Sequence, residues 1–253
     1  MTRIHLCLLT LFAASCQAVT TPAGSTAAER KPFQRGEMRL FFDTALAANF
    51  EGTVDTILGE ADPEELLLDF EGKLALRAGH EIFVADGLSV RYGVDYRRFE
   101  PTDPRNDSGA LNDFFSFEEV DYLELFAGIQ WMPERLAFGP EKKIRPYVGL
   151  KAGWVEGVKS KVGVDFQSEF LEKQSFDFEG NEFWNAGATL GLVYPVNSSL
   201  STHLGWTYEI PLGDTRDAVT LYPVPALPDF PVPISMAIEP EGWMIFFGVS
   251  YAL

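Results

Sequence analysis

Few side chains in this sequence could carry out covalent chemistry, and the most suggestive ones lie close together toward the C-terminus. Ser201 stands two positions before His203, and Glu209 follows on the same parity. Because alternate residues of a strand share a face, these three would point to one side of a sheet. Catalysis needs the serine hydroxyl within hydrogen-bonding reach of the imidazole, which a shared face does not provide. We expect hydrogen bonding inside the fold instead, and we predict that the chain is not an enzyme.

Groups that could hold a metal or a cofactor are equally scarce. The two cysteines, Cys7 and Cys16, both precede the body of the chain, so the folded part has neither a disulfide nor a thiolate site. The sequence has no phosphate-binding glycine loop and no calcium-loop spacing. The acidic residues of two expected loops are interpreted as solvated side chains: Asp103, Asp107, Asp113, Asp214 and Asp217. We predict no metal and no cofactor.

The net charge of the chain is strongly acidic. Lys and Arg number 20 against 37 Asp and Glu, which gives a net charge of −17. Binding to nucleic acid depends on basic side chains that displace counterions from the phosphates. We therefore predict that the chain has no nucleic-acid partner.

Residues 1–18 have the pattern of a signal peptide. The apolar run after Arg3 is too short to cross a membrane as a helix, and small residues follow it. Two cleavage points fit this pattern. The tetrapeptide Ala-Ala-Ser-Cys that ends at Cys16 resembles the lipobox of bacterial lipoproteins, in which the cysteine becomes a lipidated first residue, whereas a cut after Ala18 would leave no cysteine. Residues 19–36 are predicted to form a flexible tether in either case.

Beyond the tether, apolar and polar residues alternate in eight segments. A period of two is typical of β-strands, whose successive side chains point to opposite faces. In the last segment, Trp243, Ile245 and Phe247 share a broad apolar face. The predicted strands cover residues 37–50, 66–83, 87–98, 117–132, 145–157, 183–195, 199–210 and 242–253. We predict that residues 37–253 form an all-β domain of eight antiparallel strands running up and down.

The connections between these segments alternate in length. Short connections cover residues 84–86, 133–144 and 196–198, and long ones cover residues 51–65, 99–116, 158–182 and 211–241. Transmembrane barrels combine short periplasmic turns with long extracellular loops in this way, and an even strand number returns both ends to the periplasm. The last long loop is rich in proline between Leu221 and Pro233, and we expect it to fold back over the barrel mouth rather than contact a partner.

A soluble lipocalin-like barrel and a membrane barrel share this alternation, but they place the apolar face on opposite sides. Large aromatic residues near the strand ends favour the membrane barrel, because they would lie at the two membrane interfaces. These residues are Trp131, Trp154, Trp184, Tyr194, Trp243 and Tyr251. We predict that they face the lipid of the bacterial outer membrane.

The opposite face of the strands carries charges of both signs in balance. By alternation it holds six acids and six bases: Arg39, Asp43, Asp69, Glu71, Lys73, Arg77, Arg91, Asp95, Arg97, Glu124, Lys151 and Glu209. Buried charges need partners, because an unpaired charge in a low-dielectric site costs several kcal/mol. We predict a narrow lumen filled by ion pairs between these side chains.

The segment Arg-Pro-Tyr-Val-Gly-Leu-Lys-Ala-Gly-Trp at residues 145–154 is similar to the recurrent fifth-strand motif of OmpA-like small outer-membrane β-barrels. Residues 184–208 resemble the next hairpin of that family, and the resemblance implies an eight-stranded barrel domain over residues 37–253. The C-terminal alternation resembles the signal by which the barrel-assembly machinery recognises its substrates. Leu253 stands where the family usually has Phe or Trp.

These patterns favour a non-enzymatic barrel with a structural or surface-interaction role, whose long loops could meet an extracellular ligand. Two alternatives stay open, a small passive pore and a soluble lipocalin-like ligand binder. Eight strands leave an interior just wide enough to be filled by side chains, so the predicted lumenal charges favour a plugged barrel over a pore.

The sequence predicts a mature N-terminus at Cys16 or at Val19. Mass spectrometry of the mature protein distinguishes them, because only the first carries the mass of a lipid anchor. A first residue at Val19 would show that the mature protein carries no lipid anchor on Cys16.

Overall fold

The computed structural model describes residues 32–58, 64–101, 115–165, 173–213, 215–221, 232–238 and 241–253. The strands in these ranges are β1 (Met38–Leu58), β2 (Glu64–Ala85), β3 (Leu88–Pro101), β4 (Phe115–Phe117), β5 (Val120–Trp131), β6 (Arg145–Val164), β7 (Gln174–Glu179), β8 (Phe183–Pro195), β9 (Leu200–Pro211), β10 (Thr215–Leu221), β11 (Val232–Ile238) and β12 (Glu241–Ala252). The predicted signal peptide, most of the tether, the proline-rich residues 222–231 and Asp103, Asp107, Asp113 and Asp214 lie outside the described residues. Within the described ranges, no helix is long and apolar enough to cross a bilayer.

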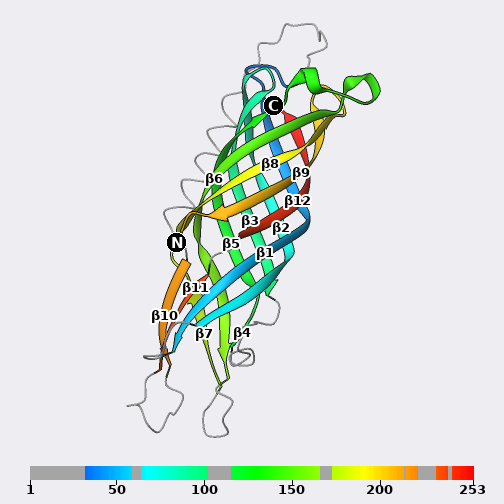
Figure 1. The fold of residues 1–253 in the computed structure, drawn as a ribbon. Coiled ribbons are helices and arrows are strands. Elements are labelled where there is room, and N and C mark those ends of the chain that lie inside the picture. The colour runs from blue at the N-terminus through cyan, green and yellow to red at the C-terminus, as the bar shows by residue number, and fades with distance from the viewer. Residues whose placement is uncertain are drawn as a thin grey trace.

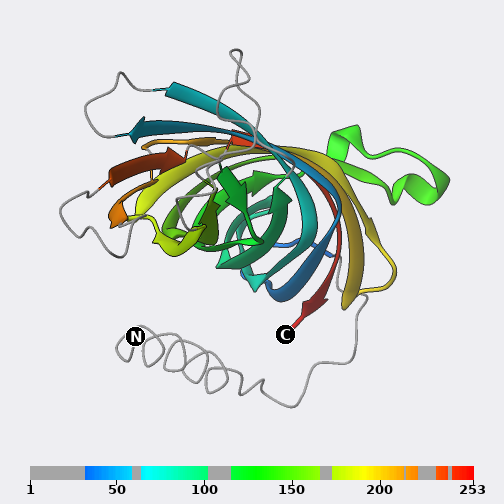
Figure 2. The ribbon, with the colours of Figure 1, turned by 90° about the horizontal axis from the view of Figure 1, so that it is seen from below.

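Eight of these strands close into a barrel. They pair antiparallel in the order β1-β12-β9-β8-β6-β5-β3-β2, and β2 pairs with β1 to complete the ring. Figures 1 and 2 show the strands winding around a common axis. The predicted fold, an eight-stranded antiparallel up-and-down barrel, is confirmed.

The barrel wall continues past the predicted segments at one end. β1, β2 and β6 are longer than the alternation predicted, and four further strands join them: β4 and β7 pair with β6, β11 pairs with β1, and β10 pairs with β11. Figure 1 shows this extension at the lower end of the molecule. The prediction that residues 51–65, 99–116, 158–182 and 211–241 are loops was therefore wrong in part, because each range contains strand.

Bulges interrupt the alternation in three strands of the wall, and in β6 the predicted segment ended at the bulge. The register of β1 shifts between Ala45 and Ala47, that of β2 shifts between Gly72 and Leu74, and β6 shifts at Gly157, which has a φ of 127°. A bulge inserts one extra residue and so reverses which parity faces inward. The period-two signal breaks at each bulge although the strand continues beyond it.

The opposite end of the barrel carries the more compact connections. Residues 86–87 join β2 to β3, residues 196–199 join β8 to β9, and residues 132–144 join β5 to β6 through the short 3-10 helices η1 (Glu134–Leu136) and η2 (Pro140–Lys142). β1 begins and β12 ends here, where the Leu253 N–H donates to the Met38 carbonyl oxygen. In outer-membrane barrels the end with the short turns and the termini is periplasmic.

The outer face of the ring is broad and apolar. Exposed large hydrophobic side chains on it include Phe42, Leu46, Ile129, Val148, Leu150, Leu190, Leu204, Trp206, Phe247 and Val249. A soluble protein rarely exposes a contiguous apolar surface of this extent. A lipocalin-like barrel needs the reverse arrangement, so the soluble alternative is wrong.

Deletion of residues 242–253 is expected to abolish assembly, because β1 and β9 would lose the neighbour they share and the ring could not close. Heat-modifiable migration on a gel after membrane fractionation measures the outcome. Leu253→Phe keeps the strand and introduces the residue usual at this position in OmpA-like barrels, so this control should migrate as the parent does. A truncated chain that migrates as a folded outer-membrane species contradicts the prediction.

Candidate functional site

The inner face of the barrel is polar and buried. Nine of the twelve residues predicted to line it are buried: Arg39, Asp43, Arg77, Arg91, Asp95, Arg97, Glu124, Lys151 and Glu209. The side chains of Asp69, Glu71 and Lys73 lie outside the described part of the structure.

Six of the buried charges form one group, here called the central charge cluster: Arg77, Asp95, Arg97, Glu124, Lys151 and Glu209. Arg97 is fully buried, with its Nη2 atom 2.6 Å from Asp95 Oδ2 and its Nη1 atom 2.7 Å from Glu209 Oε2. Arg77 Nη2 lies 2.9 Å from the same Asp95 oxygen. Arg97 Nη2 also donates to Glu209 Oε1 at 2.8 Å, and this bond and the two that Asp95 Oδ2 accepts are charge-assisted hydrogen bonds.

Lys151 joins the two glutamates of the cluster. Its Nζ atom lies 2.6 Å from Glu209 Oε1 and 2.8 Å from Glu124 Oε2. The cluster draws its side chains from β2, β3, β5, β6 and β9, and the Asn185 amide of β8 donates to Glu209 at 3.2 Å. Strands that are not neighbours in the ring, such as β3 and β9, are thereby tied across the lumen.

Glycine provides the space for these long side chains. A Cβ atom at Gly153 of β6 would collide with the Glu124 carboxylate. A Cβ atom at Gly187 of β8 would lie 3.0 Å from Glu209 Cγ and 3.2 Å from two carbon atoms of Lys151. The glycines of the alternating pattern therefore help to determine how many charges fit inside the barrel.

Three carboxylates of the cluster come close enough to suggest a metal site. Asp95, Glu124 and Glu209 each offer an oxygen within 4.8 Å of the others. The three basic side chains of the cluster already supply three positive charges in direct contact with them. A divalent cation would have to enter against these cations and break their hydrogen bonds. The arrangement is that of a neutral ion-pair network rather than of a metal site.

A second polar layer lies between the cluster and the periplasmic end. His203 Nε2 is 2.6 Å from Asp43 Oδ1, and Arg91 Nη2 is 3.4 Å from Asp43 Oδ2. Arg91 also donates to Gln130 Oε1 at 3.2 Å, and its guanidinium carbon lies 3.9 Å from the centre of the Phe41 ring. These contacts link β1, β3, β5 and β9.

Ser201, His203 and Glu209 do not assemble into a catalytic group. Ser201 Oγ accepts a hydrogen bond from Arg39 Nη1 at 2.8 Å and lies 2.7 Å from Ser250 Oγ. His203 contacts Asp43, and Glu209 belongs to the central charge cluster. Each of the three has a different partner, so the geometry does not provide a serine activated by an imidazole.

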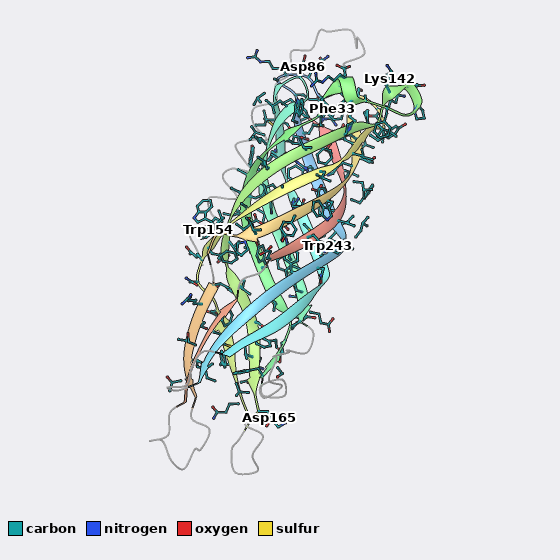
Figure 3. All side chains as sticks on the ribbon, viewed as in Figure 1. Phe33, Asp86, Lys142, Trp154, Asp165 and Trp243 are labelled. Carbon is teal, nitrogen blue, oxygen red and sulfur yellow. The ribbon has the colours of Figure 1, made fainter. Side chains whose placement is uncertain are left out.

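An apolar group closes the periplasmic end of the lumen, and we call it the periplasmic plug. It consists of Phe33, Phe83, Met132, Tyr147 and Val193. Phe33 precedes β1 and has a positive φ of 69°, and its carbonyl oxygen accepts a hydrogen bond from the N–H of Gly87 in the β2–β3 turn. Figure 3 shows Phe33 close to Asp86 of that turn. The segment before β1 therefore helps to seal the barrel.

The interior of the strand extension is apolar. Buried side chains there form the extracellular apolar cluster: Phe50, Phe99, Phe115, Val120, Tyr122, Val155, Val158, Val162, Val164, Phe178, Phe183, Ile234 and Met236. Val155, Val162 and Phe178 are completely inaccessible to solvent. Side chains from the ring strands and from β4, β7 and β11 thus pack into one core beyond the central charge cluster.

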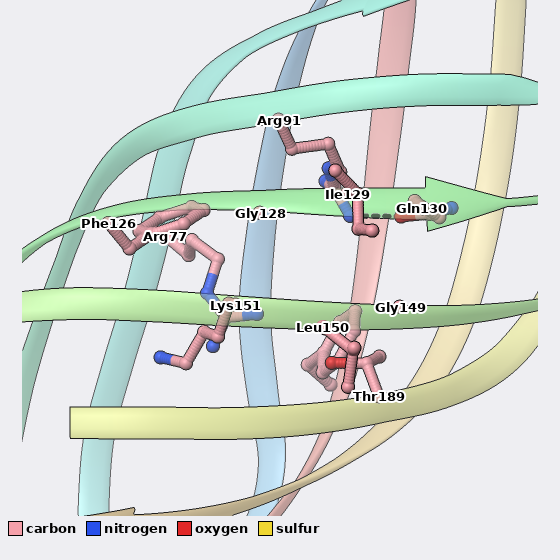
Figure 4. A pocket seen from close by; sticks show the side chains of 11 residues that line it. Arg77, Arg91, Phe126, Gly128, Ile129, Gln130, Gly149, Leu150, Lys151 and Thr189 are labelled. Atoms are coloured by element: carbon pink, nitrogen blue, oxygen red, sulfur yellow. Dashed lines mark hydrogen bonds between the residues drawn. The ribbon is translucent and has the colours of Figure 1, made fainter. Parts of the chain in front are cut away.

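A small cavity lies between Arg77, Arg91 and Lys151. It measures about 30 Å³, which is enough for about one water molecule. Figure 4 shows Arg91 joined to Gln130 beside it. At the plug, in the two polar layers and in the apolar cluster, described side chains pack or pair with one another inside the barrel.

The six predicted interface aromatics are not among the buried residues. The strand register places them at two heights along the barrel. Trp154 pairs with Trp184 toward the extension, and Trp243 pairs with Tyr208 at a similar height. The periplasmic level holds Trp131, Tyr194 and Tyr251. The strand between Trp243 and Tyr251 is about 26 Å long at about 3.3 Å per residue. A tilt of about 35–45° reduces its rise along the membrane normal to about 20 Å, which lies within the apolar band of about 25 Å in membrane barrels. Figure 3 places Trp154 and Trp243 near the middle of the molecule, so the extension projects well beyond this band.

Several buried polar residues were not predicted. Glu81 accepts a hydrogen bond from Ser89 Oγ at 2.6 Å, and its shared parity with Arg77 would have identified it. Asn185 donates to the Tyr122 hydroxyl at 2.6 Å beside the central charge cluster. An uncharged residue on the polar face gives no comparable signal, because it fits an exposed face equally well.

Comparison with known proteins agrees with this architecture. No protein-family model matches the chain, and no curated protein matches it. Among solved structures, the outer membrane protein OprG from Pseudomonas aeruginosa is 14% identical, with a TM-score of 0.56 over 87% of this chain and 99% of its own. The outer membrane protein AlkL, solved in lipid bilayers, is 20% identical, with a TM-score of 0.55 over 94% of this chain and 97% of its own.

At these identities the likeness establishes the fold. The chain has the fold of small outer-membrane β-barrels, and its apolar outer face fits the outer membrane in which such barrels lie. Membership of the OmpA-like family in particular stays a prediction, because no family model matches.

Replacement of Arg97 by methionine is expected to lower the free energy of unfolding by about 3–5 kcal/mol, because Asp95 and Glu209 would lose the partner of a buried charge. Arg98→Met is the matched control, since this neighbouring arginine is exposed and pairs with Asp121 at the surface, where ion pairs contribute little. Denaturant unfolding in detergent micelles, followed by circular dichroism, measures both. Equal losses would show that the central charge cluster contributes no more than a surface pair.

Proposed function

We propose that the chain is a closed, non-enzymatic outer-membrane barrel whose role is structural or lies in contacts made at the cell surface. The observation that carries the proposal is the filled lumen. The periplasmic plug, the two polar layers and the extracellular apolar cluster follow one another along the barrel.

A passive pore is less well supported by this geometry. Ions and small solutes need a continuous aqueous path, and an eight-stranded barrel has room for one only if its inward side chains are small. Here Arg97 and Lys151 cross the lumen to acids of other strands, and the cavity beside them holds about 30 Å³. Opening a path would require breaking buried ion pairs, which is costly.

The strand extension supports a surface role. It continues the hydrogen-bonded wall beyond the aromatic level, and its core of packed side chains, such as Val162 and Phe178, gives it a fixed shape. Exposed charges cover its outer side, including Lys159, Lys161 and Asp177. A rigid, polar structure standing above the membrane is suited to present the connecting segments to an extracellular ligand.

Two further partners belong to the proposal. The apolar outer face requires outer-membrane lipid, and the C-terminal strand β12 is proposed to be recognised by the barrel-assembly machinery. Cys16, if lipidated, would add a second attachment to the membrane through the tether.

The closed barrel is expected to give no steady single-channel current when the purified protein is inserted into planar lipid bilayers. The physical reason is that packed apolar side chains and buried ion pairs occupy the described interior. Insertion is verified in the same preparation by heat-modifiable migration. Reproducible current steps of constant size from folded protein would overturn the closed-barrel proposal in favour of the pore.

A further inference from the structure

The connection between β5 and β6 is unlike the other two at the periplasmic end. Residues 132–144, here called the lateral foot, are much longer than residues 86–87 and 196–199. Figures 1 and 2 show the foot projecting sideways from the barrel wall, and Figure 3 marks it by Lys142. A turn that only reverses the chain needs no such excursion.

The foot has a defined fold. Phe138 and Ile144 form two reciprocal backbone hydrogen bonds of 2.9 and 3.2 Å, and η1 and η2 each close a further turn. Glu141 and Lys142 hold positive φ angles of 53° and 51°, which few residues other than glycine adopt. Such backbone conformations persist where the surrounding structure fixes them.

Exposed apolar side chains continue from the barrel wall onto the foot. Leu136 is 54% exposed and Phe138 is 47% exposed. Both lie in the segment that directly follows Trp131, which is at the periplasmic edge of the lipid-facing surface. Val148, the partner of Trp131 on β6, is 50% exposed at this edge. The foot therefore extends the lipid-facing surface at the level of the membrane interface.

The charge of the foot is opposite to that of the chain. Residues 132–144 contain three bases, Arg135, Lys142 and Lys143, against the two acids Glu134 and Glu141, in a chain whose net charge is −17. A hydrogen bond from Lys143 lowers the pKa of Glu141, and Arg145 lies 3.9 Å from Glu134. Among the described ion pairs of the foot, Arg135 and Lys142 are not used, so both can serve an outside partner.

We propose that the lateral foot lies on the periplasmic leaflet of the outer membrane, with Leu136 and Phe138 inserted at the boundary of headgroups and acyl chains and with Arg135 and Lys142 bound to the phosphates of anionic phospholipids. Two observations select lipid as the partner. The apolar residues are continuous with a surface that already contacts lipid, and the excess positive charge matches anionic headgroups. The foot would thereby fix the height and tilt of the barrel in the membrane.

The test places a nitroxide spin label at residue 138 through Phe138→Cys and measures its accessibility to oxygen and to a water-soluble nickel chelate. The folded protein is placed in vesicles of phosphatidylcholine alone or with one quarter phosphatidylglycerol. The control is Ser198→Cys in the short β8–β9 turn, and the labelled parent gives the background from Cys7 and Cys16. We expect the ratio of oxygen to nickel accessibility at residue 138 to exceed that at residue 198 by about twofold or more, as for an interfacial segment.

A second arm tests the charges. Adding phosphatidylglycerol is expected to raise the ratio at residue 138 in the parent background but not in Arg135→Gln/Lys142→Gln. The matched variant Lys159→Gln/Lys161→Gln removes two exposed charges from the strand extension and should respond as the parent does. Equal accessibility at residues 138 and 198 in both vesicles overturns the proposal. A second outcome also overturns it. If the label at residue 138 is shielded from both reagents in native envelopes but accessible to both in vesicles, a periplasmic protein, rather than lipid, covers the foot.

Discussion

The fold depends on the pairing of charges enclosed in a narrow barrel. Arg97 contacts Asp95 of its own strand and Glu209 of β9, and Lys151 contacts Glu209 and Glu124. Burying such pairs costs desolvation energy that their attraction only roughly repays, so the network need not add much net stability. Its effect is on register. A shift of one strand by one residue would turn its charged side chain toward lipid and leave the partners unpaired, which makes other pairings of the strands unfavourable.

The same wall meets two environments, and its interior changes accordingly. Within the aromatic band the outer face is apolar and the lumen holds the central charge cluster. Beyond the band the outer face carries exposed charges such as Lys159 and Asp177, and the interior holds the extracellular apolar cluster. The extension is therefore organised like a soluble barrel built on top of a membrane barrel. Bulges in β1, β2 and β6 reverse the facing of the side chains along the strands that run through both parts.

This arrangement also explains how much could be predicted from the sequence. Alternation is strong in β9 and β12, which pair with each other in a register that runs unbroken between Tyr208 and Leu200. Their positions were predicted within about two residues. The prediction stopped at Gly157 in β6, because the bulge there interrupts the period while the strand continues. In β1 it ran past the bulge at Ala45–Ala47 and stopped near Phe50, before the strand ends at Leu58. Parity placed Arg97 and Glu209 on the same face, but it could not predict their contact. That contact depends on the closure of the barrel, which brings β3 and β9 face to face, and on the space left by Gly153 and Gly187. For Ser201, parity placed His203 on the same face without making it a partner, and the closed ring supplies Arg39 and Ser250 as its partners.

A barrel whose lumen is filled can interact with other molecules only through its wall and its two ends. The exposed apolar side chains of the wall contact lipid, and Phe33 and its neighbours close the periplasmic end. The two ends differ in kind: one carries the polar extension, and the other carries the basic, apolar lateral foot. In such a barrel, the lateral foot would hold the protein at a fixed depth in the membrane, and the strand extension would stand in water outside the cell. That asymmetry favours a role in presenting a surface over a role in moving solutes through the membrane.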